Sequence, residues 1–469
     1  MRFLFLLSLL VGGLTPLCAQ SSQANDPIKG QYVPIYRAYK KKLNELGYPV
    51  GRAGNAAWVP GQYTLRYQGT KAASNFAKDL GKLKARFGKN KVRVIGECGC
   101  SEEFKIYNIE ITNVGGEERG KRGRDKIAST IGQEEVEPNY YVVPELEQLK
   151  NNSPFNQLPA NFMVVKAANN NRPVTIAVLD TGIDTYFQHP ESVGKRAPLY
   201  LWENPAPNGK NDPFCLKDDL IGWDFINKDN APVDDHSHGT HVASRIAQQL
   251  KLNAPAVNYR FMSVKMLDHD GVGTTFHAAC AVAYAALNGA DIINASWGFY
   301  GESDRNLREA FLLAQSRGVV TMTSAGNFRR DVKETKHYPS GFSLDAPVLR
   351  SILFLSASQT GVQLWPRTNF RAEPLATGSH FYAAPGSNLL GFVPHYFGVP
   401  NNLGRKSGTS IATPYATALA AQYVHQYPSH SSYLLRTRII SAIESQGASG
   451  SLSYRGRLLP YKVFNWVTF

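Results

Sequence analysis

Apolar and polar positions alternate in two different ways along the chain. Between residues 60 and 143, helical and strand periods follow one another at short intervals. Phe76, Leu80 and Leu83 recur at helical spacing, whereas residues 104–111 alternate as a half-buried strand does. The predicted elements are strands at 63–67, 92–97, 104–111 and 136–143, and helices at 73–87 and 125–131. This β-α-β-β-α-β order is typical of a small α+β ferredoxin-like unit.

The pattern changes after residue 172. Val174–Leu179 is an almost continuous apolar run, as expected of a strand that is buried on both faces. Helices are then predicted at 238–249, 276–287 and 306–317, and strands at 261–266, 292–295, 319–324 and 352–357. This alternation predicts an α/β fold with a doubly wound, mostly parallel sheet. Residues 144–172 show little periodicity, and we interpret them as a linker between the two units.

The chain begins with the pattern of a secretory signal peptide. Arg2 precedes an apolar run over residues 3–14, and small residues follow up to about residue 20. The run is too short to span a membrane, and no later run of about 18 apolar residues follows it. We therefore expect residues 1–20 to direct export, giving a secreted or periplasmic protein without a membrane span. Cys18 also raises the alternative of a lipoprotein anchor, which Leu17 disfavours.

Composition and charge narrow the function only a little. Apolar residues make up 43 % and charged residues 19 % of the chain, which excludes a mainly disordered, collagen-like or coiled-coil protein. The net charge of +14 would suit an anionic partner. Because solubility alone explains such a charge, we expect no nucleic-acid partner.

Four cysteines follow the signal segment: Cys98, Cys100, Cys215 and Cys280. Export permits disulfides, but the spacing leaves all three connectivities open. We interpret Cys98-Gly99-Cys100 as a strand end or loop rather than half of a metal site. Cys280 lies in an Ala-rich helical stretch, which predicts a buried apolar residue.

Three polar segments stand at predicted strand or helix ends. Asp180 ends the first buried strand, where open α/β sheets form their active crevice, although a turn-capping Asp would look the same. His238 stands at a helix start, where it is placed for proton transfer. His241 lies three residues on; the spacing and the missing Glu disfavour a zinc pair, and we interpret His241 as a core histidine.

The third segment surrounds Ser410, which follows a Gly-Thr turn and opens an Ala-rich helix. Pro414 is expected only in the first turn of a helix, so it fixes the helix start near Ser410. An N-cap serine is the structural alternative to a nucleophile there.

Together, in the order Asp, His, Ser, these segments resemble the subtilisin-like serine proteases, or subtilases. The motifs that carry the resemblance are Asp180-Thr181-Gly182, His238-Gly239-Thr240-His241, Ser324-Ala325-Gly326-Asn327 and Gly408-Thr409-Ser410-Ile411-Ala412-Thr413-Pro414. The likeness runs from about residue 174 to 464, which makes residues 173–469 a catalytic domain. Residues 60–143 are similar to the inhibitor-type propeptide of the family, with Val136-Glu137-Pro138-Asn139 as the marker, and residues 21–59 precede it as an extension.

The resemblance implies a secreted serine endopeptidase made as a zymogen, which hydrolyses polypeptides through an acyl-enzyme on Ser410. His238 would act as base and then acid, and Asp180 would orient and stabilise the imidazole. The Asn327 amide and the Ser410 N–H would stabilise the oxyanion. The propeptide would block the cleft until cleavage between about Pro144 and Ser153, and we expect the mature protein to be a monomer.

The resemblance also implies substrate-binding residues. Ser296, Trp297 and Gly298 would offer an edge to an extended peptide, and Ser324, Ala325 and Gly326 would wall the primary specificity pocket. Phe299 and Phe328 depart from the family pattern, which argues against a preference for basic side chains and allows an apolar one; ordinary packing would explain either residue equally well.

Calcium and the reaction itself leave alternatives open. Calcium binding is a property of many subtilases, but residues 208–219 and 249–259 lack a regular ligand spacing, so no metal ligand is predicted. Two rival functions are a non-catalytic binding protein that kept the fold, and a peptide ligase or cyclase that uses the same acyl-enzyme.

Overall fold

The computed structural model describes residues 37–463, except residues 39, 52–55, 100, 113–119, 134, 145–157, 159–161, 168–170, 207–213, 346–348, 350–351, 361–362, 371–380, 447, 450–451, 455–456 and 460. The predicted signal peptide and most of the predicted linker therefore lie outside the described residues.

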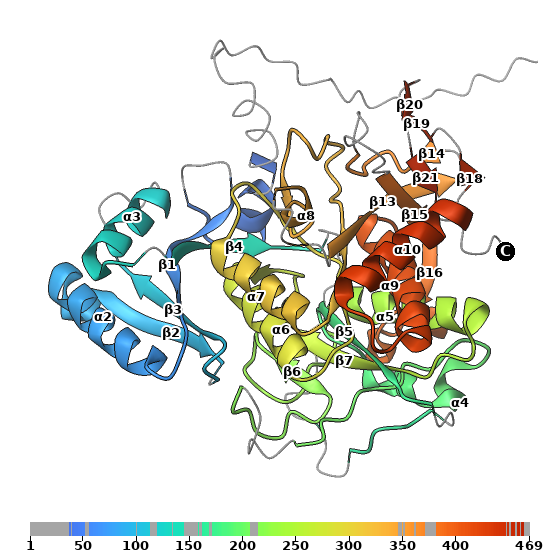
Figure 1. Ribbon diagram of the computed structural model, residues 1–469, viewed down its shortest axis with the longest axis horizontal. Helices are drawn as coiled ribbons and strands as arrows, with labels where there is room; N and C mark the ends of the chain where they lie inside the picture. The colour runs from blue at the N-terminus through green and yellow to red at the C-terminus, as the bar shows by residue number, and fades with distance from the viewer. Residues whose placement is uncertain are drawn as a thin grey trace, which may run out of the picture.

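The amino-terminal unit is an antiparallel sheet covered by two helices. Its elements are β1 (Trp58–Tyr67), α2 (Ala72–Phe87), β2 (Val92–Cys98), β3 (Lys105–Ile111), α3 (Gly120–Ile131) and β4 (Val136–Val142). The strand order is β2-β3-β1-β4, and α2 and α3 pack on one face, where Phe76, Leu83 and Ile127 meet the sheet residues Leu65 and Ile109. The predicted β-α-β-β-α-β order is present. The other face of this sheet lies against the second unit (Figure 1).

The second unit is built on a long, mostly parallel sheet with the order β18-β21-β15-β13-β11-β9-β5-β7-β6. Its strands are β5 (Val174–Asp180), β6 (Gly222–Asp224), β7 (Tyr259–Lys265), β9 (Ile292–Ala295), β11 (Val320–Ser324), β13 (Ile352–Thr360), β15 (Phe381–Pro385), β18 (Ala448–Ser449) and β21 (Tyr461–Val463). Its longer helices are α5 (His238–Asn253), α6 (Thr275–Leu287), α7 (Arg305–Ser316), α9 (Thr409–Gln426) and α10 (Ser432–Gln446). Short elements complete it: β8 (Gly273–Thr274), β10 (Phe299–Tyr300), β12 (His337–Tyr338), β14 (Gln363–Leu364), β16 (Leu389–Phe392), β17 (Leu403–Lys406), β19 (Leu452–Tyr454), β20 (Arg457–Leu459), α4 (Pro190–Val193) and α8 (Phe342–Asp345).

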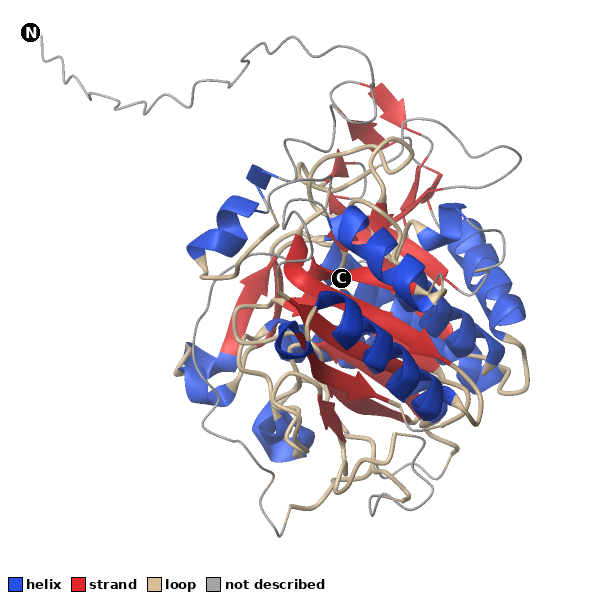
Figure 2. Cartoon of the chain, turned by 90° about the vertical axis from the view of Figure 1, so that its left-hand side faces the viewer, coloured by secondary structure: helices blue, strands red, loops and turns tan. Residues whose placement is uncertain are grey.

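Helices cover both faces of this sheet (Figure 2). Successive residues of a strand point to opposite faces. Ile176 and Val178 of β5 therefore join the core formed with α5, α9 and α10, whereas Ala177 and Leu179 join the core formed with α6 and α7. This is the doubly wound arrangement that the hydrophobic pattern predicts, and it brings the carboxyl ends of β5, β9 and β11 to one edge.

The two units are joined by strand pairing and by a disulfide. Strand β4 pairs with β8 of the second unit, Tyr141 with Thr274 and Val142 with Gly273. Cys98 is bonded to Cys280. Cys280 is fully buried, as predicted, but its interpretation as an apolar packing residue is wrong, because it forms this disulfide. Helix α6 packs against the end of β2, a proximity that the sequence does not reveal. Cys98 does end a strand, as expected.

No helix within the described part of the chain is long and apolar enough to cross a membrane.

Candidate active site

Asp180 and His238 form a buried pair at the carboxyl end of β5. His238 Nδ1 lies 2.8 Å from Asp180 Oδ1 and 2.9 Å from Oδ2, and both side chains are nearly inaccessible. The close approach depends on glycine, because a Cβ on Gly239 would lie 2.1 Å from the Gly182 carbonyl oxygen. The first turn of α5 can therefore rest directly on the turn that follows β5.

Asp234, which the sequence analysis did not single out, organises the loop before His238. Its Oδ1 accepts hydrogen bonds from the Thr181 hydroxyl at 2.7 Å and the Ser237 N–H at 2.8 Å, and its Oδ2 accepts one from the Thr240 N–H at 2.8 Å. Burial alone would raise the pKa of Asp234, but the hydrogen bonds from Thr240 and Thr181 lower it below its usual value. A permanent anion thus fixes Ser237 in a left-handed conformation with φ 88°. The only sequence signal for Asp234 is its place among the short polar residues before the helix.

Ser410 lies in the first turn of α9, which begins at Thr409. The expected helix start is confirmed, but the reason given for it is wrong, because Pro414 lies inside the helix. A proline has no N–H to donate to the carbonyl four residues before it, which here is that of Ser410. The Ser296 hydroxyl donates to this carbonyl instead, at 3.0 Å. The N-cap position belongs to Gly408, so Ser410 is not a capping serine.

The two groups that would exchange a proton are both buried. His238 Nε2 and Ser410 Oγ each lack a hydrogen-bond partner among the described residues. Because Asp180 accepts the proton of Nδ1, the neutral His238 ring presents Nε2 as an acceptor. The structure thus joins Asp180 to His238 directly and leaves the Ser410 hydroxyl unpaired. In many free enzymes the hydrogen bond between the catalytic histidine and the nucleophile tightens only when substrate binds.

Asn327 follows β11 and turns its side chain toward the start of α9. Its Oδ1 accepts the Thr409 N–H at 2.9 Å. Since an amide has one acceptor oxygen and one donor nitrogen, this bond assigns the orientation and leaves Nδ2 as the group able to donate beside Ser410. The Asn327 N–H is held by the Tyr300 hydroxyl at 3.1 Å.

Residues 296–298 contact the chain's own amino-terminal unit. Gly298 N–H donates to the Val143 carbonyl at 2.9 Å, and Val143 N–H donates back to Gly298 at 3.0 Å. The bridge is antiparallel, and Val142 pairs with β8 on the other side. A segment of the amino-terminal unit therefore lies as an extended strand between two edges of the second unit. Ser296 and Trp297, which precede Gly298, are fully buried.

Ser324 is the last residue of β11, Ala325 and Gly326 follow it, and all three are buried. His337, which sequence reasoning missed, packs between the two glycines of the predicted substrate site. A Cβ on Gly298 would lie 2.2 Å from its ring, and one on Gly326 would lie 2.9 Å from it. Burial lowers the pKa of His337 to about 3, so the ring is neutral near pH 7. No motif marks this residue.

Phe299 and Phe328 both pack against neighbouring rings. Phe299 stacks on Tyr140 of the amino-terminal unit, with ring centroids 5.7 Å apart. Phe328 meets Tyr300 edge to face at 5.2 Å. Packing therefore accounts for both departures from the family pattern.

The buried ammonium of Lys265 stabilises the loops that carry Asp180 and His238. Lys265 ends β7 and donates to Asp235 at 2.6 Å, to the Thr181 carbonyl at 2.9 Å and to the Leu267 carbonyl at 2.8 Å. Although burial disfavours its charge, Asp235 and Asp224 raise the pKa of Lys265 above its usual value. The ammonium thus ties the turn after Asp180 to the loop before His238.

The other two histidines of this helix end do not join the pair. His236 lies with its ring 6.5 Å from that of His238, and burial lowers its pKa to about 3, so it brings no positive charge to the site near neutral pH. His241 is fully buried and faces the Leu389 carbonyl, 3.1 Å from Nε2, as expected of a core histidine.

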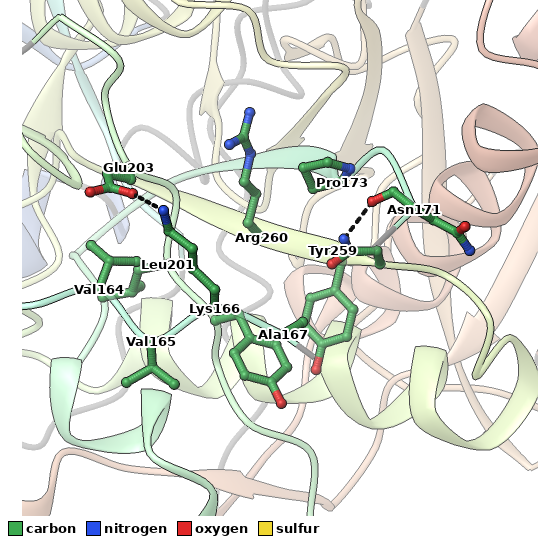
Figure 3. A pocket seen from close by; sticks show the side chains of 12 residues that line it. Val164, Val165, Lys166, Ala167, Asn171, Pro173, Leu201, Glu203, Tyr259 and Arg260 are labelled. Atoms are coloured by element: carbon green, nitrogen blue, oxygen red, sulfur yellow. Dashed lines mark hydrogen bonds and ion pairs between the residues drawn. The ribbon is translucent and has the colours of Figure 1, made fainter. Parts of the chain in front are cut away.

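Within the described residues, no group of three or more His, Cys, Asp or Glu side chains could hold a metal ion. A cavity of about 330 Å³ lies elsewhere, at the amino ends of β5 and β7 (Figure 3). Its lining includes Pro173, Tyr259 and Arg260, together with Lys166 and Glu203, which form an ion pair at 2.7 Å. Since β5 separates it from Asp180 by roughly 20 Å, this cavity has no part in the site.

The second unit is similar to known proteins. The model of the subtilase family matches residues 171–456. The chain is 27 % identical over 303 residues to the thermophilic serine proteinase of Bacillus sp. (strain AK1), covering 63 % of this chain and 61 % of that protein. It is 27 % identical over 297 residues to thermitase of Thermoactinomyces vulgaris, covering 62 % and 88 %.

A solved structure with a similar fold is that of fervidolysin from Fervidobacterium pennivorans, a keratinolytic enzyme related to subtilisin. The match has a TM-score of 0.53 at 20 % identity and covers 89 % of this chain and 61 % of that one. The family match spans more than half of the chain, over the unit that carries Asp180, His238, Asn327 and Ser410. The chain therefore belongs to the subtilase family of serine peptidases.

Proposed function

We propose that the protein is an exported serine endopeptidase made as a zymogen, with Ser410 as nucleophile. The observation that carries the proposal is the buried Asp180–His238 pair, together with the lack of a hydrogen-bond partner at both His238 Nε2 and the buried Ser410 Oγ among the described residues. A buried polar atom without a hydrogen-bond partner costs stability. We therefore expect His238 Nε2 and Ser410 Oγ to bond to each other during the reaction. The signal-like first 20 residues support export.

The chemistry follows from the proton positions. His238 Nε2 takes the proton of Ser410 Oγ as that oxygen attacks the peptide carbonyl, and Asp180 stabilises the resulting imidazolium. The negative charge that develops on the carbonyl oxygen is met by Asn327 Nδ2 and the Ser410 N–H. His238 then returns the proton to the leaving amine, and water releases the acyl group by the reverse exchange.

We also propose that the amino-terminal unit inhibits the enzyme until the chain is cut between about Pro144 and Ser153. Val143 and Val142 pair with Gly298 and Gly273 as a peptide substrate would, so the unit occupies the edges that substrate needs. The Asn139 side chain also accepts the Phe276 N–H at 3.0 Å, which fixes the unit on the first turn of α6.

Mass spectrometry of the purified wild type and Ser410→Ala tests self-processing. We expect two fragments from the wild type and an intact chain from the variant. If both proteins stay intact after signal removal, self-processing is wrong.

A serine-reactive fluorophosphonate should label Ser410 once the amino-terminal unit is displaced; failure to label would favour a non-catalytic binding protein. Products formed with an added amine nucleophile would distinguish ligation from hydrolysis.

A further inference from the structure

The amino-terminal unit is attached to the second unit by a bond that cleavage of the linker does not break. Cys98 ends β2, and Cys280 lies in the middle of α6, 182 residues further along the chain. Any cut between residues 144 and 153 falls inside the loop that this disulfide closes. Cutting one peptide bond there produces two chains that are still covalently joined.

The disulfide holds the unit at the place where its inhibitory contacts lie. Cys280 follows Phe276 by one helical turn, and Phe276 is the residue that donates to Asn139. From Asn139 the strand continues through Tyr141 and Val142, paired with β8, to Val143 on Gly298. A tether on the same helix keeps this strand beside its binding edges at an effective concentration in the millimolar range, whatever the dilution.

We propose that the Cys98–Cys280 disulfide retains the amino-terminal unit as a covalently bound inhibitor after the chain has been cut, so that full activity requires a thiol reductant or further proteolysis of the unit. The inference rests on the proposed protease function for its inhibitory consequence, whereas the retention itself rests only on the disulfide. An inhibitory segment that is held by non-covalent contacts alone can dissociate on dilution. The disulfide prevents the amino-terminal unit from doing so.

The reductive step balances with a dithiol. One thiolate of the dithiol attacks a sulfur of the disulfide, and the other cysteine leaves as a thiolate that takes up a proton. The second thiol of the reagent then displaces the first cysteine and closes a disulfide within the reagent. Cys98 and Cys280 gain two electrons and two protons in total, and the dithiol loses the same number.

A small dithiol has a route to the bond. Cys98 is 8 % exposed, whereas Cys280 is fully buried. Cys98 also lines a cavity of about 530 Å³ between the units, bounded by Gly96 and Lys105 on one side and by Trp223 and Phe276 on the other. Attack is therefore expected at Cys98, the cysteine that lines this cavity.

The test must isolate this bond, because Cys215 is disulfide-bonded as well. The double variant Cys100→Ser/Cys215→Ser keeps Cys98–Cys280 as the sole disulfide of the exported chain. Adding Ser410→Ala and a recognition site for an unrelated protease between residues 150 and 153 opens the chain without any self-cleavage. We expect one species after cutting on a non-reducing gel and in gel filtration under denaturing conditions, and two with dithiothreitol. Separation without reductant would overturn the proposal.

The inhibitory consequence is tested with Ser410 intact. We expect the cut double variant to hydrolyse peptides about 100-fold more slowly before reduction than after it. A matched variant that also carries Cys98→Ser and Cys280→Ser should reach full activity after cutting without a reductant. If this variant fails to fold, the rates of the double variant with and without dithiothreitol still test covalent inhibition. Equal rates before and after reduction would refute covalent inhibition. Absence of fluorophosphonate labelling after reduction would refute the protease function instead, while the gel result on retention would stand.

Discussion

The Ser296 hydroxyl donates a hydrogen bond to the backbone carbonyl of Ser410 at 3.0 Å. Pro414 creates the need for this bond, since it cannot supply the helical N–H. Ser296 is held in turn by Asn294 Nδ2 at 2.9 Å, and Asn294 Oδ1 accepts the Thr417 hydroxyl at 2.8 Å. A chain of buried hydrogen bonds thus connects β9 to the helix that presents the nucleophile.

Removing this hydroxyl should affect both stability and turnover. In Ser296→Ala the Ser410 carbonyl stays buried without a donor, which we expect to lower the free energy of unfolding by about 1–3 kcal/mol. Urea denaturation checks the value, and kcat should fall because the turn that carries Ser410 loses its support. Ser316→Ala provides the control, since its exposed hydroxyl bonds to the Leu313 carbonyl in its own helix. Equal stability of the two variants would contradict the assigned role.

The two ends of the Asn327 amide can be separated by mutation. Asn327→Asp keeps an oxygen for the Thr409 N–H but loses the donor, whereas Asn327→Ala loses both. We expect kcat to fall by about 100- to 1000-fold in each, the loss measured for the corresponding donor in subtilisin of the same family. Only Asn327→Ala should also lower the melting temperature. An Asn327→Asp enzyme with wild-type kcat would exclude Asn327 as the oxyanion donor.

Lys265 is predicted to be essential for stability. Lys265→Met leaves Asp235 as a buried carboxylate without its cation, which should cost about 3–5 kcal/mol in the free energy of unfolding. The double variant Lys265→Met/Asp235→Asn should regain part of this loss. Lys166→Met removes the exposed ion pair with Glu203 and should change stability by less than about 1 kcal/mol. A double variant no more stable than Lys265→Met would show that the ion pair is not the cause.

His337 is expected to limit the size of the side chain that the primary pocket accepts. His337→Ala removes the ring that packs between Gly298 and Gly326. Cleavage after large apolar residues should then rise by about tenfold relative to cleavage after small ones. A peptide-library profile measures the ratio. Ser340→Ala serves as the control, because it keeps the ring and removes the hydroxyl that bonds to His337 Nδ1 at 2.9 Å and to the His337 carbonyl at 2.7 Å. An unchanged ratio in His337→Ala would place the ring outside the pocket.

The contact between the units should weaken as the pH rises. Burial, followed by the nearby charge of Asp304, raises the pKa of Glu137 to about 8, and Glu302 adds to this shift. The positive charges of Arg124 and Arg305 oppose the shift. Asp304 is itself raised to about 6, chiefly by burial. At these two carboxyls the folded protein holds protons that the unfolded chain has released, so their contribution to stability falls as the pH increases through the folded-state pKa values of about 6 and 8.

Glu137→Gln removes the group that titrates. Its melting temperature relative to the wild type should therefore be higher at pH 9 than at pH 5. Glu110→Gln, which alters an ion pair with the exposed Arg93, is the matched control. The same difference at both pH values for Glu137→Gln would mean that this carboxyl does not carry the dependence.

The sequence by itself identified Asp180, His238 and Ser410 as candidates, because each stands at an end of an element that local periodicity defines, and the resemblance to the subtilases added Asn327. Alternating and continuous apolar runs reveal which segments are strands and helices, and parallel strands bring their carboxyl ends to one edge. The order of the amino-terminal elements was predictable for the same reason. Roles in catalysis remain proposals that the geometry supports.

Only the tertiary structure decided which distant residues meet. The pairing of Cys98 with Cys280, the packing of His337 between two glycines and the bond from Ser296 to Ser410 each join residues that no local pattern connects. Such contacts depend on how helices and sheets dock, and docking is set by the complementary shapes of many side chains at once. Local sequence patterns therefore show which residues are present, but they do not show which of these distant residues come into contact.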